Sequence, residues 1–186
     1  MAIFAAVLDA CVMVPVSLCD TLLRLAEARM YRPIWSERIL AETHMAIAEV
    51  HPQLRREQVD RRIRYMEESF PGARTDGFEM LEEALVLPDP DDRHVLAAAI
   101  RSRADAIVTS NLKDFPEATL RRFDIEAIHP EQFLLSQLDM AGRTVIEVLD
   151  AQAAAARNPR LSRDDVLTSL VRAGVPRFVD EVRRRG

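Results

Sequence analysis

Residues 87–100 read LPDPDDRHVLAAAI, so three carboxylates stand at the entrance of an apolar helix. Aspartates at a helix start are ordinary, because their side chains cap free N–H groups and suit the positive end of the helix dipole. We expect Asp89 or Asp91 to take this role. Asp92 is different, because apolar residues follow it at i+3, i+4 and i+7 and place it on the inward-facing stripe. A carboxylate there needs a partner, and a metal ion is one candidate.

Two acids earlier in the chain are candidate co-ligands. Residues 3–8 form an apolar run typical of a strand covered on both faces, and Asp9 follows its carboxyl end, where open α/β sheets place their ligands. Glu42 interrupts the apolar face of a helix predicted over residues 36–49. The alternatives are that Asp9 begins a turn and that Glu42 snorkels or pairs with Arg38.

A second polar loop follows an apolar strand that begins at residue 105. It reads TSNLKDF over residues 109–115, so Asn111 and Asp114 lie beyond a strand's carboxyl end, where further ligands would sit. The alternative is a turn with Asn111 in the left-handed region and Asp114 capping the next segment.

The order of predicted elements indicates an α/β fold. Strands are predicted over residues 3–8, 33–35, 105–108 and 125–128, and helical patterns over residues 15–29, 36–49, 51–70, 76–84, 92–103 and 117–123. Strands that alternate with helices favour a parallel sheet with helices on its faces. After the last predicted strand only helices are predicted. One opens at Pro130, and beyond about residue 138 the next ends near residue 158 and two more follow. We therefore predict two domains, residues 1–137 and a small all-helical extension over residues 138–186.

Composition narrows the class of protein. The net charge of −5 over 186 residues argues against binding nucleic acid by bulk electrostatics, although a local basic groove is compatible with it. The two cysteines, Cys11 and Cys19, fit neither a disulfide framework nor a zinc site. No apolar run approaches the roughly 20 residues of a membrane span, so we expect no membrane association and a cytoplasmic location.

Histidine offers no clear general base. His94 is the nearest of the four histidines to the acids, and as a first-turn residue it is expected to be exposed rather than catalytic.

Four segments, taken in order, resemble the PIN-domain ribonucleases. They are Val7-Leu8-Asp9, SERILAE over residues 36–42, the stretch over residues 87–99, and TSNLKDF over residues 109–115. The resemblance covers about residues 3–135 and is strongest to the VapC-type toxins of bacterial toxin–antitoxin pairs, including a subgroup with a helical C-terminal extension. It implies a PIN-like α/β/α sandwich.

The resemblance also implies a site and an activity. Asp9, Glu42, Asp92 and Asp114 would form the acidic, metal-binding catalytic site, with Asn111 and Thr109 in support. The implied cofactor is Mg²⁺ or Mn²⁺, which prefer oxygen ligands and suit phosphodiester hydrolysis. The implied substrate is RNA, the implied regulator is a small antitoxin protein, and the implied assembly is a homodimer.

Two residues depart from the family pattern. Many members have a small hydroxyl residue shortly after the first aspartate, where this chain has Ala10-Cys11, and some have Asp where this chain has Asn111. The second change removes a negative charge and favours one strongly held ion over two.

The leading hypothesis is therefore a metal-dependent endoribonuclease, the toxin of a type II toxin–antitoxin system. One alternative is a catalytically weak or inactive PIN-like module that binds RNA or protein. Another is a metal-dependent phosphatase that uses the same acids. The scarcity of glycine, five in all, argues against the phosphatase because no Gly-rich phosphate-binding loop is visible.

Overall fold

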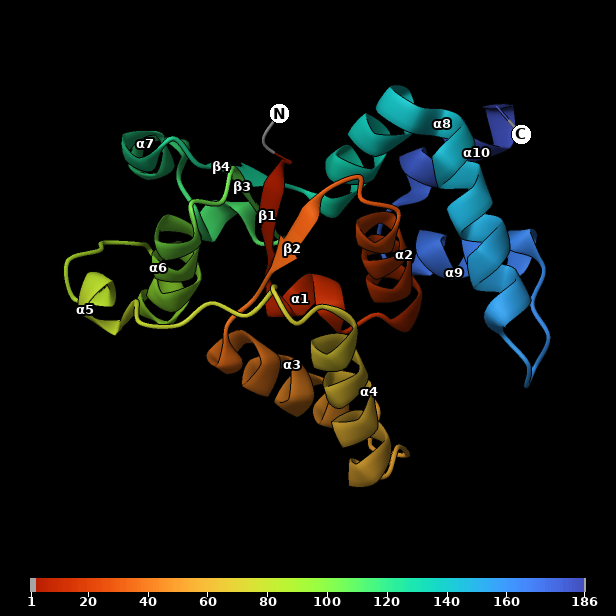
Figure 1. Ribbon diagram of the computed structural model, residues 1–186, viewed down its shortest axis with the longest axis horizontal. Helices are drawn as coiled ribbons and strands as arrows, with labels where there is room; N and C mark the ends of the chain where they lie inside the picture. Colours follow the sequence, from red (N-terminus) through yellow and green to blue (C-terminus); the bar gives the residue numbers. More distant parts are fainter. Residues whose placement is uncertain (1–2, 186) are drawn as a thin grey trace.

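A computed structural model describes residues 3–185, in which four strands form one parallel sheet in the order β2-β1-β3-β4 (Figure 1). The strands are β1 Ala5–Leu8, β2 Arg32–Ile34, β3 Ala106–Val108 and β4 Glu126–Ile128. The predicted α/β class and its four strands are confirmed.

The strand register brings several loops to one edge of the sheet. Val7 pairs with Ile34, and Val108 pairs with both Leu8 and Ile128, so all four strands end at the same level. Residues that directly follow β1, β2 and β3 therefore gather at the carboxyl edge, as parallel strands require.

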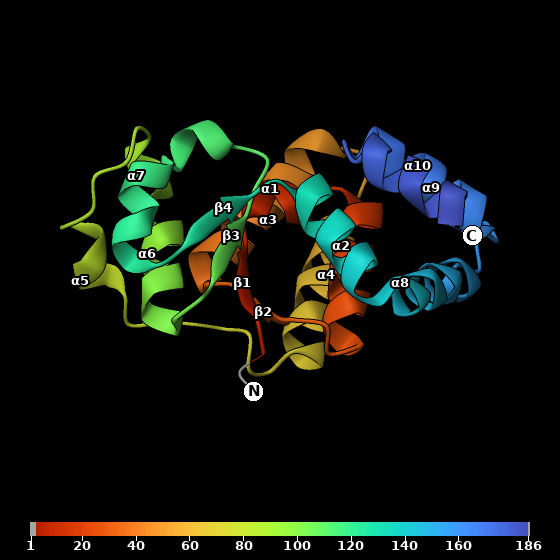
Figure 2. The same ribbon diagram turned by 90° about the horizontal axis from the view of Figure 1, so that it is seen from above.

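Helices cover both faces of the sheet. The α-helices are α1 Ala10–Met13, α2 Val16–Glu27, α3 Glu37–Val50, α4 Arg56–Ser69, α5 Glu79–Glu82, α6 Arg93–Ser102, α7 Glu117–Leu120, α8 Pro130–Ala155, α9 Arg163–Arg172 and α10 Pro176–Arg185. Short 3₁₀ turns are η1 Pro90–Asp92, η2 Leu112–Asp114 and η3 Arg121–Phe123. Figures 1 and 2 show α6 on one face and α2 with the start of α8 on the other, which gives three layers.

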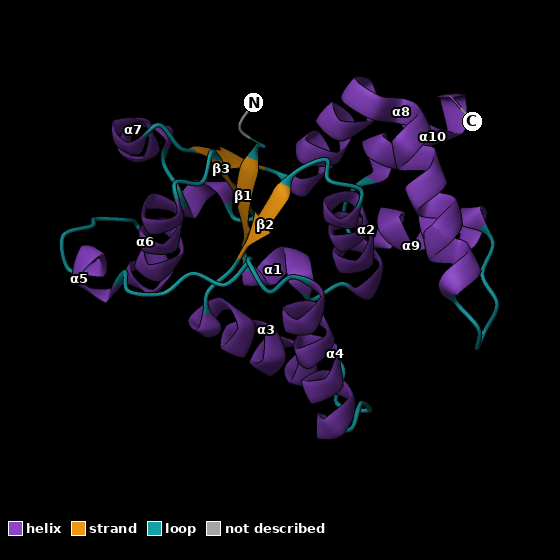
Figure 3. Cartoon of the chain, in the orientation of Figure 1, coloured by secondary structure: helices purple, strands orange, loops and turns teal. Residues whose placement is uncertain are grey.

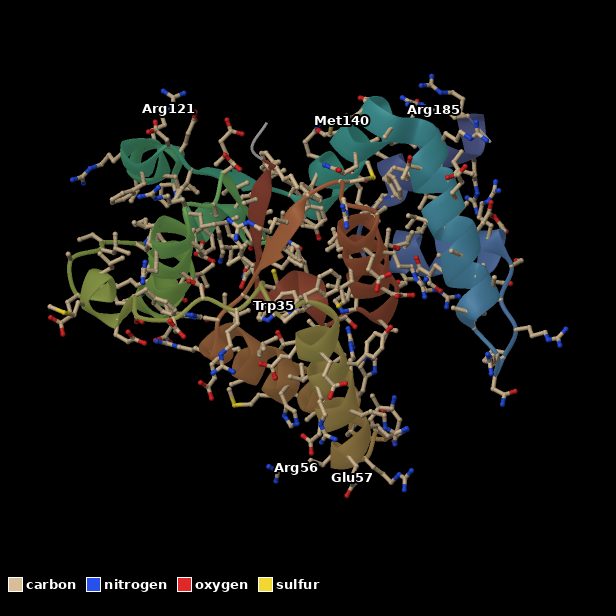
Figure 4. All side chains as sticks on the ribbon, viewed as in Figure 1. Trp35, Arg56, Glu57, Arg121, Met140 and Arg185 are labelled. Carbon is tan, nitrogen blue, oxygen red and sulfur yellow. The ribbon has the colours of Figure 1, made fainter. Side chains whose placement is uncertain are left out.

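The core lies between the sheet and these helices. All four residues of β1 are almost completely buried, as expected of a central strand covered on both faces. Trp35, which follows β2, is fully buried and packs edge-on against Phe70 with ring centroids 5.9 Å apart. Figure 4 shows Trp35 in the interior and Arg56 and Glu57 at the outer end of α4, so α3 and α4 form an arm below the carboxyl edge.

The C-terminal helices α8, α9 and α10 pack on one another at one end of the molecule, and α8 and α9 also pack on α2 (Figure 3). A buried polar contact joins them to the sheet domain. The Thr21 hydroxyl donates to Gln152 Oε1 at 2.7 Å, and Gln152 Nε2 donates to the Ser17 carbonyl oxygen at 3.0 Å. Since buried polar groups must find partners, this pair fixes how α8 lies on α2.

Two helices are predicted between residues 130 and 158, and the range α8 contains two helical segments. They are separated by a kink at Ala141, whose φ of −148° and ψ of 58° are not helical. Buried residues lie on both sides of the kink, so both segments pack against the core. The predicted boundary between residues 137 and 138 falls inside α8 and stays a prediction. Within residues 3–185, no helix has the length and apolar character needed to cross a bilayer.

Candidate active site

Asp9 is held by two elements at the carboxyl edge of the sheet. It follows β1 and is the N-cap of α1, where its Oδ1 accepts a hydrogen bond from the Ala10 N–H at 2.7 Å. Its Oδ2 accepts a hydrogen bond from the hydroxyl of Thr109, which follows β3, also at 2.7 Å. Asp9 is only 6% exposed. The two alternatives for Asp9, a residue that begins a turn and a residue of the site, are therefore compatible. As the N-cap of α1, Asp9 begins the turn, and this role orients its carboxylate at the edge of the sheet.

Cys11 takes the place of the hydroxyl residue expected after the first aspartate. Its thiol donates to Asp9 Oδ2 with a sulfur–oxygen distance of 3.2 Å, and its sulfur accepts the Ser110 N–H at 3.3 Å. Burial, and then the negative charge of Asp9, raise the pKa of the Cys11 thiol to about 11. The thiol thus stays protonated and serves as a weak donor to the carboxylate.

Asp92 ends the 3₁₀ turn η1 and is the N-cap residue of α6. Asp89 caps this turn by accepting the Asp91 N–H at 2.9 Å, which confirms that one of the first two aspartates has the capping role. Asp92 makes no such cap bond and is half-buried. Burial, followed by the negative charges of Asp9, Asp89 and Asp114, raises the pKa of Asp92 to about 6. Asp92 therefore lies close enough to Asp9, Asp89 and Asp114 to be repelled by their charges.

Asp114 and Asn111 lie on the loop after β3. Asp114 is half-buried in η2, and the backbone N–H of Asn111 donates to Thr109 Oγ1 at 3.0 Å. The Asn111 side chain is exposed, and its φ of −97° shows that the left-handed alternative is wrong. The loop thus supports Thr109 through its backbone, and a ligand role for the Asn111 side chain stays a prediction.

Glu42 lies on α3 and contacts two basic side chains, Arg38 and His94. Its Oε1 is 3.3 Å from Arg38 Nε, one turn earlier, and 3.0 Å from His94 Nε2 on α6. Burial raises the pKa of Glu42, but the contacts with His94 and Arg38 outweigh it and leave that pKa lowered. The expected alternative of an Arg38-paired Glu42 is present in the structure. Glu42 is therefore ionised, and its contact with His94 links α3 to α6, the helix that follows Asp92.

The expectation that His94 is exposed is wrong. The side chain is 1% exposed, because α6 packs between β1 and β3 on one side and α5 on the other. The signal for this burial is the run Ala97-Ala98-Ala99 on the same helix, since three adjacent alanines, all fully buried here, indicate a helix approached closely on several sides.

The acids gather without converging on one point. Within residues 3–185, no three His, Cys, Asp or Glu side chains are placed closely enough to hold an ion. The donor set nevertheless fits a hard divalent cation, because it consists of carboxylate oxygens, the ligands that Mg²⁺ and Mn²⁺ prefer. The raised pKa of Asp92 agrees with this, since Asp92 would ionise more easily beside a positive charge.

Comparison with known proteins gives the family. A model described as "PIN domain" matches residues 5–113, which is more than half of the chain. The chain belongs to the PIN-domain family. A second model, described as "VapC50 C-terminal domain", matches residues 130–184 and thus covers α8, α9 and nearly all of α10.

A curated PIN relative extends the comparison. The chain is 43% identical over 93 residues to a protein of Mycobacterium tuberculosis (strain ATCC 25618 / H37Rv) named "Putative ribonuclease VapC50". The alignment covers 50% of this chain and 54% of that protein, so it spans about half of each. No solved structure matches the chain. These matches confirm the predicted resemblance to the VapC-type branch of the PIN family.

Proposed function

We propose that this protein is a metal-dependent endoribonuclease that hydrolyses RNA phosphodiester bonds and is the toxin of a type II toxin–antitoxin system. The observation that carries the proposal is the position of Asp9 and Asp114 after β1 and β3 of a PIN sheet, with Asp92 near both. Burial and the charges of Asp9, Asp89 and Asp114 raise the pKa of Asp92 to about 6. Isolated surface acids have no reason to crowd in this way, whereas groups with perturbed pKa values gather at functional sites.

Asp9, Glu42, Asp92 and Asp114 would hold the cation, Mg²⁺ or Mn²⁺. When bound, it supplies positive charge that lowers the pKa of a coordinated water and neutralises the scissile phosphate. Thr109, Cys11 and the Ala10 N–H orient Asp9, so the first ligand is fixed before any ion arrives. Without an ion, Asp92 takes up a proton near pH 6 and relieves the repulsion among the acids.

The relative's name supports the proposed substrate, and the family supports the proposed partners. The named activity of that relative is a ribonuclease, which supports RNA as the substrate here. We propose that the protein acts in the cytoplasm as a homodimer, and that a small antitoxin protein holds it inactive. These assignments rest on the family and are independent of the geometry of the acids.

Cleavage by purified variants tests the activity. Asp9→Asn and Asp92→Asn should each abolish the Mg²⁺- or Mn²⁺-dependent cleavage of RNA while circular dichroism shows an unchanged fold. Asp91→Asn is the matched control, because Asp91 is exposed and belongs to the same 3₁₀ turn. Full activity in both site variants would contradict the proposal, as would equal loss in the control.

A second candidate function is a PIN-like module that binds RNA or a protein without cutting. The lack of three converging ligands within residues 3–185 favours it. Calorimetry with Mn²⁺ separates the two functions, because a nuclease site should bind the ion at millimolar concentration or better. Absence of binding by the wild-type protein would favour the inert module.

A further inference from the structure

His94 is a buried imidazole beside the acidic site, and no step of the proposed hydrolysis uses it. It is the second residue of α6, two positions after Asp92, and is 1% exposed. Its Nε2 lies 3.0 Å from Glu42 Oε1, which is within hydrogen-bond distance. Its Nδ1 is buried with no hydrogen-bond partner among the described residues. The only polar contact found for this ring in residues 3–185 is therefore directed at a candidate ligand of the metal.

Asp9, another candidate ligand, is fixed in a different way. Its Oδ1 accepts the N–H of Ala10, the first residue of α1, and its Oδ2 accepts the hydroxyl of Thr109, which follows β3. Glu42 lies inside α3, where the backbone N–H groups are used by the helix and cannot orient a carboxylate. Its position must come from another side chain.

Two side chains contact Glu42, and they differ in how firmly they can hold it. Arg38 is 45% exposed, reaches Glu42 Oε1 only at 3.3 Å, and also contacts Glu82 Oε2 at 3.3 Å. An exposed pair of this kind has little effect, because water screens it and both side chains are mobile. His94 is shielded from water and makes the shorter contact, so the imidazole is the firmer support.

The contacts of Arg38 Nε and His94 Nε2 both fall on Oε1, while Oε2 of Glu42 has no hydrogen-bond partner among residues 3–185. A carboxylate with one oxygen held and the other free has the form of a metal ligand supported from behind, as partner groups support ligating carboxylates in known metal sites.

We propose that His94 is a positioning residue that holds Glu42 by Oε1 and leaves Oε2 for the divalent cation. The inference rests on the proposed function, because it takes Glu42 as a ligand of that cation. His94 acts through Glu42 and touches neither the substrate nor the ion. It also ties α3 to α6, so one contact joins the helix that carries Glu42 to the helix that follows Asp92.

Binding of Mn²⁺ by the full chain, measured by calorimetry, tests this role without an activity assay. His94→Leu removes the N–H and should weaken binding by about 10- to 100-fold. His94→Gln should stay within about threefold of wild type, because the glutamine amide supplies an N–H at a similar reach, whereas the shorter His94→Asn should behave like His94→Leu. The matched control is His44→Leu. His44 also lies on α3, but its Nε2 pairs with Asp60 Oδ1 at a distance of 2.7 Å and not with a candidate ligand.

The outcomes separate this role from the proposed function. In a Glu42→Gln background, His94→Leu should have no further effect on binding, because coupled residues do not act additively. Wild-type affinity in both His94→Leu and His94→Asn would overturn the role of His94 and leave the nuclease proposal standing. Equal weakening in His94→Gln would also overturn it, because the shape of the ring rather than its N–H would then matter. A wild-type protein that binds no Mn²⁺ would overturn the metal site and this role together.

Discussion

Asp92→Asn is expected to stabilise the metal-free protein at pH 7.5, although it removes a proposed ligand. Burial and three neighbouring carboxylates raise the pKa of Asp92 from 3.8 to about 6, so the ionised side chain is unfavourable in the folded state. At about 1.4 kcal/mol per pKa unit, this amounts to about 3 kcal/mol. Because Asp92 is half-buried and water screens part of the repulsion, we expect a gain of about 1 to 2 kcal/mol.

The pH dependence of this gain has a definite sign. A carboxyl group with a raised pKa binds its proton more tightly in the folded state, so its contribution to stability is lost as the pH rises from about 4 to about 6. The advantage of Asp92→Asn should therefore be absent below pH 4 and fully developed above pH 6. At about 2 to 4 °C per kcal/mol, the expected rise in Tm at pH 7.5 is about 2 to 8 °C.

Thermal unfolding in EDTA and in Mn²⁺ measures both effects. Mn²⁺ should stabilise the wild type, by about 1.4 kcal/mol at ten times its Kd, and should leave Asp92→Asn nearly unchanged. Asp91→Asn is the control and should stay within about 0.5 kcal/mol of wild type in both conditions. A lower Tm for Asp92→Asn in EDTA would refute the repulsion argument. A wild-type response to Mn²⁺ in that variant would refute the place of Asp92 in the metal site.

Two further predictions concern the groups that hold Asp9. Thr109→Val removes a buried hydroxyl that donates to Asp9 Oδ2, so it should lower the free energy of unfolding by about 2 kcal/mol. Thr109→Ser keeps the hydroxyl and should retain most of this stability. Equal melting temperatures for wild type and Thr109→Val would contradict this prediction. With Cys19 replaced by Ala, Cys11 in the folded protein should react with iodoacetamide at pH 8 about 100-fold more slowly than in urea, because its pKa is raised from 9.0 to about 11. Asp9→Asn should speed the folded-state reaction, and a folded rate equal to the rate in urea would show that the thiol is not shielded.

The parts of the site that the sequence could predict are those set by local periodicity. Asp92 is half-buried because the helix repeat places it with Val95, Leu96 and Ala99, all of which are buried. Asp9 is predictable as the residue after a fully apolar strand, and the parallel register places it at the same edge as Thr109. These inferences needed only the period of a helix and the direction of strands.

The contact between Glu42 and His94 could not be predicted in this way. It depends on where α3 crosses the first turn of α6, and no periodicity within either helix determines that crossing. The same holds for the contact between Thr21 and Gln152, which joins helices from distant parts of the chain. Long-range side-chain pairs of this kind arise from packing, so they become visible only when the elements are placed in space.

The metal site is tested most directly by a crystal grown in Mn²⁺, with the anomalous signal of the ion used to locate it. We expect a peak within ligand distance of carboxylate oxygens of Asp9 and Asp92, and no such peak in crystals of Asp92→Asn. A peak elsewhere, or none at a saturating concentration of Mn²⁺, would contradict the proposed site.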